Sequence, residues 1–167
     1  VHSENFYSLG GIDFDCLVEV RKDYPVSLHG IGMSLGSHDG IDKNHLAKVR
    51  ALVNEIDPFL VSDHLSWNSV SDKFLPDLLP APFNDEALEV FTRNISIVQE
   101  SLGRELLLEN PFTYFEFTES TMSEYEFLNI LTKKTGAKVI LDINNIYISG
   151  LNNGWSSAEY IKNINTS

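Results

Sequence analysis

Short runs of apolar residues alternate along the chain with segments in which apolar residues recur every three or four positions. Compact runs of Val, Ile and Leu are typical of parallel strands buried on both faces, whereas the longer spacing marks one face of a helix. Five β-rich runs predict β-strands, and the last three of them contain such compact apolar stretches. The five runs cover Val1–Phe6, Pro25–Ile31, Phe59–Trp67, Glu105–Pro111 and Lys138–Ser149. This alternation predicts βαβ units and a parallel sheet.

Four segments between these runs have the pattern of amphipathic helices. Helix-capping residues support two of them, because Asn and Ser are favoured before a helix and Gly is favoured after it. The predicted helices run from Asp13 to about Tyr24, over Leu46–Ile56, from Asn84 to Gly103 and from Ser123 to Gly136. The segment Asn68–Phe83 contains aromatic residues and prolines, and we expect it to form an ordered loop over the sheet.

Each of the later predicted strands ends on a polar residue, and the spacing of these residues indicates a barrel. His29, His64, Glu109 and Asp142 are 35, 45 and 33 residues apart, compared with about 31 residues per unit in an eight-unit (β/α)8 TIM barrel. Five strands cannot close such a barrel. We therefore expect residues 1–167 to form a single, incomplete domain of about five βα units, with the N-terminal strand and the C-terminal strands of the barrel absent.

Composition and charge argue against some classes of binding partner and against a membrane location. The formal net charge is −12, which argues against nucleic-acid binding because neutralising phosphates requires a basic surface. No apolar run approaches the roughly 20 residues of a membrane span. Cys16 is the only cysteine, so no internal disulfide can form, and a cytoplasmic location is expected. Cys16 lies on the apolar face of a predicted helix, where we expect a buried structural thiol.

The four strand-end residues point to a metal site. In a closed barrel, the strand ends surround the C-terminal mouth, where barrel active sites lie. A single His or Glu at such a position is more often a hydrogen-bonded polar group than a ligand. Burying two imidazoles and two carboxylates together without a cation would, however, cost several kcal/mol. A divalent metal with nitrogen and oxygen ligands is therefore favoured.

Two other features carry less weight. The segment Gly30–Gly36 resembles a dinucleotide-binding loop, but its third glycine is one position late and no helix is predicted to start there. His38 and His45 lie in polar stretches, and we expect both to be solvated.

Several strings occur in an order that resembles the multinuclear non-heme iron-dependent oxidative enzymes, the family of the methanobactin-modifying MbnB. The resemblance spans essentially the whole chain, and the combined strings are specific although each one alone is weak. The strings are His2–Phe6, Ser27–Gly36, Ser62–Trp67, Asp77–Pro80, Leu107–Pro111 and Leu141–Asn145.

The resemblance implies a xylose-isomerase-like TIM barrel with two or three iron ions, Fe2+ or Fe3+, in its mouth. It also implies that dioxygen is used to modify cysteine residues of a ribosomally made precursor peptide, as in RiPP biosynthesis. Enzymes of this kind typically work with a partner protein that holds the leader of the peptide.

The resemblance also implies roles for individual residues. His29 and His64 look like iron ligands, Glu109 looks like a bridging carboxylate, and Asp142 and Asn145 look like ligands of a neighbouring ion. The family pattern continues with further ligands that do not occur before the end of this chain, so the cluster would be incomplete here.

A second group of polar residues has two open interpretations. His2, Glu4 and Asn5 match the first family string, and Asn110 and Asn144 lie next to the proposed ligands. These five residues either support the ligands or the substrate, or are ordinary hydrogen-bonded polar residues.

Three alternatives remain open from the sequence. A zinc-dependent hydrolase or endonuclease could use the same barrel, although a nuclease should carry a basic groove. A sugar isomerase typically has a catalytic lysine at a strand end, whereas Lys138 precedes its strand. The third alternative is a non-catalytic barrel that binds metal or has lost its chemistry.

Overall fold

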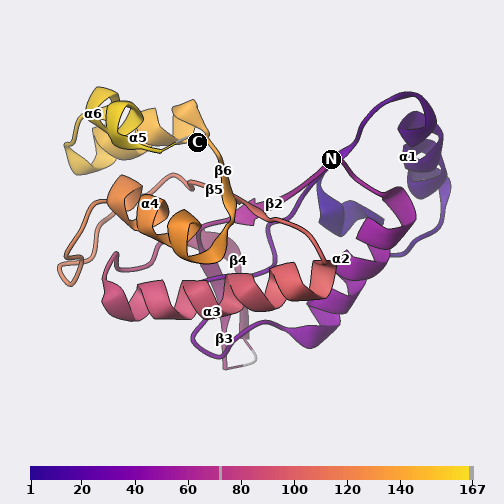
Figure 1. The fold of residues 1–167 in the computed structure, drawn as a ribbon, viewed down its shortest axis with the longest axis horizontal. Coiled ribbons are helices and arrows are strands. Elements are labelled where there is room, and N and C mark those ends of the chain that lie inside the picture. Colours follow the sequence, from indigo (N-terminus) through magenta and orange to yellow (C-terminus); the bar gives the residue numbers. More distant parts are fainter. Residues whose placement is uncertain (72, 166–167) are drawn as a thin grey trace.

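The computed structural model describes residues 1–71 and 73–165, and its centre is a sheet of parallel strands in the order β1-β2-β5-β6 (Figure 1). Each strand pairs in parallel with its neighbour, so the carboxyl ends of the strands meet at one edge of the sheet. The strands cover Ser27–His29 (β1), Leu60–His64 (β2), Leu107–Glu109 (β5) and Lys138–Ile140 (β6). The prediction of a parallel sheet built from alternating strands and helices is confirmed.

Helices α2, α3 and α4 form a continuous row in which α3 contacts both of the others (Figure 1). Their inward faces join the strands in one buried cluster, in which Leu28 of β1 and Leu108 of β5 are completely enclosed. Each such buried Leu contributes about 1.5–3 kcal/mol relative to its exposed state. The helices cover Ile12–Asp23 (α1), Lys43–Ile56 (α2), Asp85–Leu102 (α3), Glu124–Thr135 (α4), Ile143–Asn153 (α5) and Ser157–Asn163 (α6).

The predicted helix caps are present. The side chain of Asn84 accepts a hydrogen bond from the amide of Ala87 at the start of α3. Ser123 and Glu126 form both hydrogen bonds of a capping box at the start of α4. Helices α3 and α4 end at glycines in the left-handed conformation, which satisfies the last carbonyl groups without the strain that a side chain would add.

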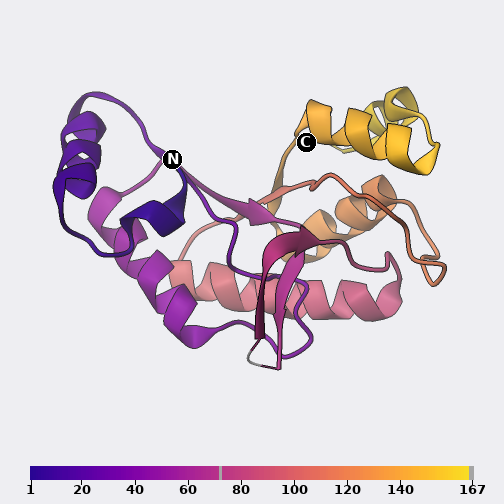
Figure 2. The same cartoon turned by 180° about the vertical axis from the view of Figure 1, so that it is seen from behind.

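Three element predictions are wrong. Val1–Phe6 is not a strand, because after one bridge between His2 and His29 the chain turns into the 3-10 helix η1 (Ser3–Phe6). The predicted strand Lys138–Ser149 is too long, since Asp142 caps α5 by accepting the amide of Asn145 and so ends β6 early. Asn68–Phe83 is not a loop, as most of it belongs to the antiparallel hairpin of β3 (Trp67–Val70) and β4 (Lys73–Leu79). Figure 2 shows this hairpin in front of α3.

The environments of two side chains also differ from expectation. Cys16 is exposed rather than buried, because α1 buries only Phe14 and Leu17. His45 is half-buried, and its ring nitrogen lies 3.4 Å from the hydroxyl of Tyr7, so the expectation of a solvated side chain is wrong there. His38 is exposed, as expected. Among the described residues, none of the helices combines the length and the hydrophobicity needed to cross a lipid bilayer.

Candidate metal centre

The structure brings His29, His64 and Glu109 together at the carboxyl edge of the sheet. β1, β2 and β5 are neighbours in register, with His29 beside Ser62 and His64 beside Glu109. One potential ligand atom from each of His29, His64 and Glu109 lies within 4.8 Å of the other two. Regular parallel pairing therefore converts three positions that are far apart in the sequence into one cluster.

The two carboxylate oxygens of Glu109 face different imidazoles. Oε2 lies 3.1 Å from Nε2 of His29, and Oε1 lies 3.8 Å from Nε2 of His64. The two imidazole centroids are 4.6 Å apart. A carboxylate placed in this way can contact two cations, one through each oxygen.

Backbone and hydroxyl groups orient the two imidazoles. Nδ1 of His64 lies 3.2 Å from the carbonyl oxygen of Gly30, and because a carbonyl only accepts, this nitrogen carries the proton. The lone pair of Nε2 then faces Glu109. Nδ1 of His29 lies 2.7 Å from the hydroxyl of Ser62, which can donate or accept. An oriented ring with a free Nε2 lone pair is the arrangement that metal-binding histidines use.

Burial sets the charge state of these ligands. It lowers the pKa of His29 to about 4, with His64 and His2 as further causes, and it also lowers the pKa of His64. Both imidazoles are therefore neutral at pH 7, the form that binds metals. Burial also raises the pKa of Glu109, and the charge of Asp142 raises it further. A bound cation would offset the unfavourable burial of the Glu109 charge, so the donor set fits a divalent metal.

Asp142 and Asn145 lie outside the cluster of three. Asp142 accepts the amide of Asn145 through Oδ1, and its backbone is held by Asn110, which accepts from its N–H and donates to its carbonyl. Asn145 donates its side-chain N–H to the carbonyl of Asn110. Asn110 thus locks the end of β5 to the start of α5, and the ligand roles of Asp142 and Asn145 stay predictions.

Glu4 has a clear structural role beside the cluster. Its Oε1 accepts the amides of Ile31 at 2.9 Å and Gly32 at 3.1 Å, so it holds the loop that follows β1. Its Oε2 is buried and has no hydrogen-bond partner among the described residues.

The other candidate residues near the cluster have fewer contacts. His2 is exposed, with its ring centroid 5.6 Å from that of His29. Asn5 and Asn144 are exposed, and within the described part of the chain no hydrogen bond joins their side chains to the cluster.

Asp63 belongs to this region and was missed by the sequence reasoning. Its side chain is buried, accepts the amide of His64 at 2.8 Å and accepts the amide of Met33 at 3.3 Å. Burial raises its pKa to about 8. Gly30 accommodates it, since a Cβ there would lie 2.4 Å from Oδ2 of Asp63. The only sequence signal was a carboxylate directly before His64, on the opposite face of the strand.

A family model described as "RiPP precursor modification enzyme MbnB/TglH/ChrH" matches residues 1–167 of the chain. The chain belongs to this family. RiPPs are ribosomally made peptides that are modified after translation. The expected family resemblance is thereby confirmed at the level of RiPP precursor modification, and a group of His and Glu residues that could hold a metal ion lies at the strand ends.

The chain is also similar to curated proteins named UPF0276, a name that states no function. One from Rhizobium meliloti is 46% identical over 96% of this chain and 52% of its own length. One from Rhizorhabdus wittichii is 47% identical over 98% of this chain and 59% of its own length. One from Vibrio parahaemolyticus is 44% identical over 98% of this chain and 57% of its own length. The chain thus spans between half and three-fifths of the length of these relatives.

A solved structure supports the fold. The crystal structure of D-psicose 3-epimerase in the presence of D-fructose matches 89% of this chain and 54% of that chain, with a TM-score of 0.57 and 15% identity. At this identity the likeness concerns the fold alone. The predicted xylose-isomerase-like TIM barrel, present here as a partial barrel, is confirmed.

Proposed function

We propose that this chain contributes the metal-binding strands of an iron-dependent oxidase, which uses dioxygen to modify cysteine residues of a ribosomally made precursor peptide. Membership of a RiPP precursor modification family supports the class of substrate. The observation that carries the proposal is the convergence of two neutral imidazoles and one carboxylate within 4.8 Å at the strand ends.

His29, His64 and Glu109 are the residues proposed to hold the metal, and Asp142 and Asn145 are proposed to extend the site to a second or third ion. The donor atoms are nitrogen and oxygen only, which suits iron and tolerates zinc. Iron bound there would supply the redox chemistry that couples dioxygen to the oxidation of a thiol.

The remaining contributions come from the protein itself. The carbonyl of Gly30 fixes the proton of His64 on Nδ1, so that Nε2 faces the site. The hydroxyl of Ser62 contacts Nδ1 of His29, on the side of the ring that faces away from Glu109. Asp63 holds the backbone of His64 and the loop at Met33, which keeps the first two strand ends in place. Precise support of this kind determines both metal affinity and the position of a bound substrate.

The proposal is tested with the full-length protein and a cysteine-containing precursor peptide, together with the proposed leader-binding partner protein. We expect more iron than zinc in protein made in iron-replete cells, and an oxygen-dependent mass change on a cysteine-containing fragment. The matched controls are the same reaction without dioxygen and a peptide with Ser in place of each Cys. Stoichiometric zinc with negligible iron, together with no mass change in air, would instead support the hydrolase alternative.

A further inference from the structure

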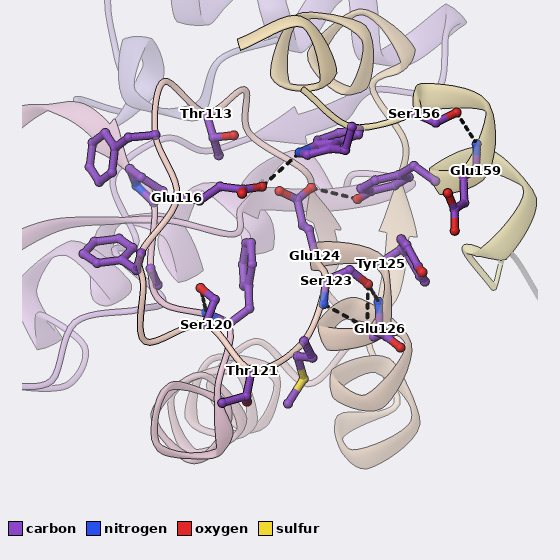
Figure 3. Close-up of a pocket in the computed structure, with 18 residues that line it drawn as sticks. Thr113, Glu116, Ser120, Thr121, Ser123, Glu124, Tyr125, Glu126, Ser156 and Glu159 are labelled. Atoms are coloured by element: carbon purple, nitrogen blue, oxygen red, sulfur yellow. Dashed lines mark hydrogen bonds between the residues drawn. The ribbon is translucent and has the colours of Figure 1, made fainter. Parts of the chain in front are cut away.

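A cavity of about 560 Å³ lies apart from the metal cluster, between the β5–α4 connection, the start of α4 and the turn from α5 to α6 (Figure 3). Aromatic side chains form much of its wall, including Phe83, Phe117, Trp155 and Tyr160. Glu116 and Glu124 are among its acidic lining residues, and none of the described residues that line it is Lys, Arg or His. Its wall is therefore acidic and aromatic, and we call it the acidic–aromatic cavity.

Glu124 is the buried acidic group of this cavity, with only 8% of its surface exposed. Its Oε1 accepts a hydrogen bond of 2.7 Å from the hydroxyl of Tyr160. Its other oxygen has no hydrogen-bond partner among the residues that the structure describes. That oxygen is not completely enclosed by the described residues, so it can be reached from the cavity. Figure 3 shows the carboxylate pointing into the cavity, towards Glu116. One carboxylate oxygen of this largely buried side chain is thus available to a ligand in the cavity.

The second carboxylate and the aromatic rings surround this oxygen. Glu116 accepts a hydrogen bond of 3.0 Å from the indole N–H of Trp155, which fixes it at the cavity wall. The indole of Trp155 stacks on Tyr160 with centroids 5.6 Å apart and planes inclined by 22°. Burial, and to a smaller extent the charge of Glu116, raises the pKa of Glu124. A positive charge between the two carboxylates would offset both the burial of the Glu124 charge and its repulsion by Glu116.

This chemistry excludes most classes of ligand. An anion would meet two carboxylates and no basic group. An apolar ligand would shield the free oxygen of Glu124 from water without giving it a hydrogen-bond partner, which is unfavourable. A divalent metal needs more ligands than the cavity offers, since within residues 1–71 and 73–165 only His29, His64 and Glu109 form a group of three or more potential ligands. An organic cation satisfies both the carboxylates and the aromatic faces.

We propose that the acidic–aromatic cavity binds a guanidinium group on an alkyl chain, as presented by an arginine side chain of the precursor peptide. The guanidinium is planar, donates several N–H groups to carboxylates and stacks on aromatic rings, which matches Glu116, Glu124 and Trp155. The peptide as the source of the arginine rests on the proposed function. The guanidinium site itself does not, because it requires neither metal nor dioxygen.

The first test measures binding to the full-length protein without iron or dioxygen, by titration calorimetry with N-acetylarginine amide. The matched probe is N-acetylcitrulline amide, which has the same shape and no charge. We expect saturable binding of the arginine compound and binding at least about tenfold weaker for the citrulline compound, since a charge-assisted hydrogen bond contributes about 1.5–3 kcal/mol. Equal binding of the two probes, or binding of neither, would overturn the proposal.

Variants then locate the site. Glu124→Gln keeps an acceptor for Tyr160 but removes the charge, and it should weaken binding at least about tenfold. Glu116→Gln changes an exposed side chain, so the variant should fold normally, and it should weaken binding in the same direction. Glu119→Gln is the matched control, because Glu119 is exposed in the same connection and does not line the cavity. Unchanged affinity in both Glu124→Gln and Glu116→Gln would place the ligand elsewhere and refute the proposal.

A final comparison identifies the source of the guanidinium. Precursor peptides with each arginine replaced in turn by citrulline should bind more weakly at one position, and Glu124→Gln should abolish that difference. If N-acetylarginine amide binds at Glu124 but no citrulline replacement affects the peptide, the precursor peptide is not the ligand and this part of the proposal is wrong. Because binding is read without turnover, a failure of oxidation chemistry leaves these results interpretable.

Discussion

Replacing Glu124 by Gln should change the pH dependence of stability in a direction that the structure determines. Burial raises the pKa of Glu124 from 4.5 to about 7, against the smaller opposing effect of the hydrogen bond from Tyr160. The folded protein therefore holds the proton at pH values where the unfolded chain has released it. This contribution to stability is fully present below about pH 4.5 and is lost as the pH rises through about 7.

The magnitude follows from the same two values. A difference of about 2.5 pH units corresponds to about 3 kcal/mol, at 1.36 kcal/mol per unit. Gln has no proton to lose and keeps an acceptor for the hydroxyl of Tyr160. We therefore expect Glu124→Gln to be close to neutral at pH 5 and to stabilise the ligand-free protein by up to about 3 kcal/mol at pH 8.5.

Urea denaturation of both proteins at the two pH values measures this difference. Because both proteins share every other titrating group, the comparison isolates Glu124. Glu119→Gln, which changes an exposed carboxylate in the preceding connection, should show no pH-dependent difference from wild type. A stability difference between Glu124→Gln and wild type that is equal at pH 5 and pH 8.5 would refute the reasoning.

Three further substitutions test the packing and the ligand support. Gly36→Ala would place a Cβ 2.6 Å from the ring of Phe91, so urea denaturation should show a loss of about 1–3 kcal/mol, and an unchanged midpoint would contradict this packing. Asn94→Ala removes two buried hydrogen bonds to the segment after β1 and should cost about 2–3 kcal/mol in the same assay, whereas a neutral effect would show that those carbonyls find other partners. Ser62→Ala frees Nδ1 of His29 and should weaken metal affinity about 10- to 100-fold in competition with a chelator, with unchanged affinity counting against the role of Ser62.

Local signals in the sequence were sufficient for most of the sheet and for the core of the site. Apolar runs located β1, β2, β5 and β6, and parallel pairing then forces His29, His64 and Glu109 to one edge. Capping residues located the ends of α3 and α4 within a few residues. These features depend on neighbours in the chain or on the regular geometry of a parallel sheet, so periodicity is enough to find them.

The errors have two causes, since each depends either on contacts that are distant in sequence or on a competing local hydrogen bond. Val1–Phe6 was predicted as a strand, yet the carboxylate of Glu4 accepts the amides of Ile31 and Gly32 after β1, and the chain turns there. The apolar residues after Asp142 resemble a strand, but the side chain of Asp142 caps a helix instead.

The polar groups that were missed have the same explanation. The pairing of Glu124 with Tyr160 joins residues 36 positions apart, and no periodic pattern reports it. The buried carboxylate of Asp63 accepts the amide of Met33, which lies 30 positions earlier.

The metal content of full-length Glu109→Gln, compared with that of wild type, tests the metal centre most directly. The substitution keeps the shape of the side chain and removes the negative charge between the two imidazoles. If Glu109 binds metal, the variant should lose at least one metal equivalent by elemental analysis and melt at a lower temperature in its metal-loaded form. Its metal-free form should melt no lower than metal-free wild type, because a buried carboxylate without a cation is the costly state. Full retention of metal by Glu109→Gln would contradict the assignment of His29, His64 and Glu109 as a metal centre.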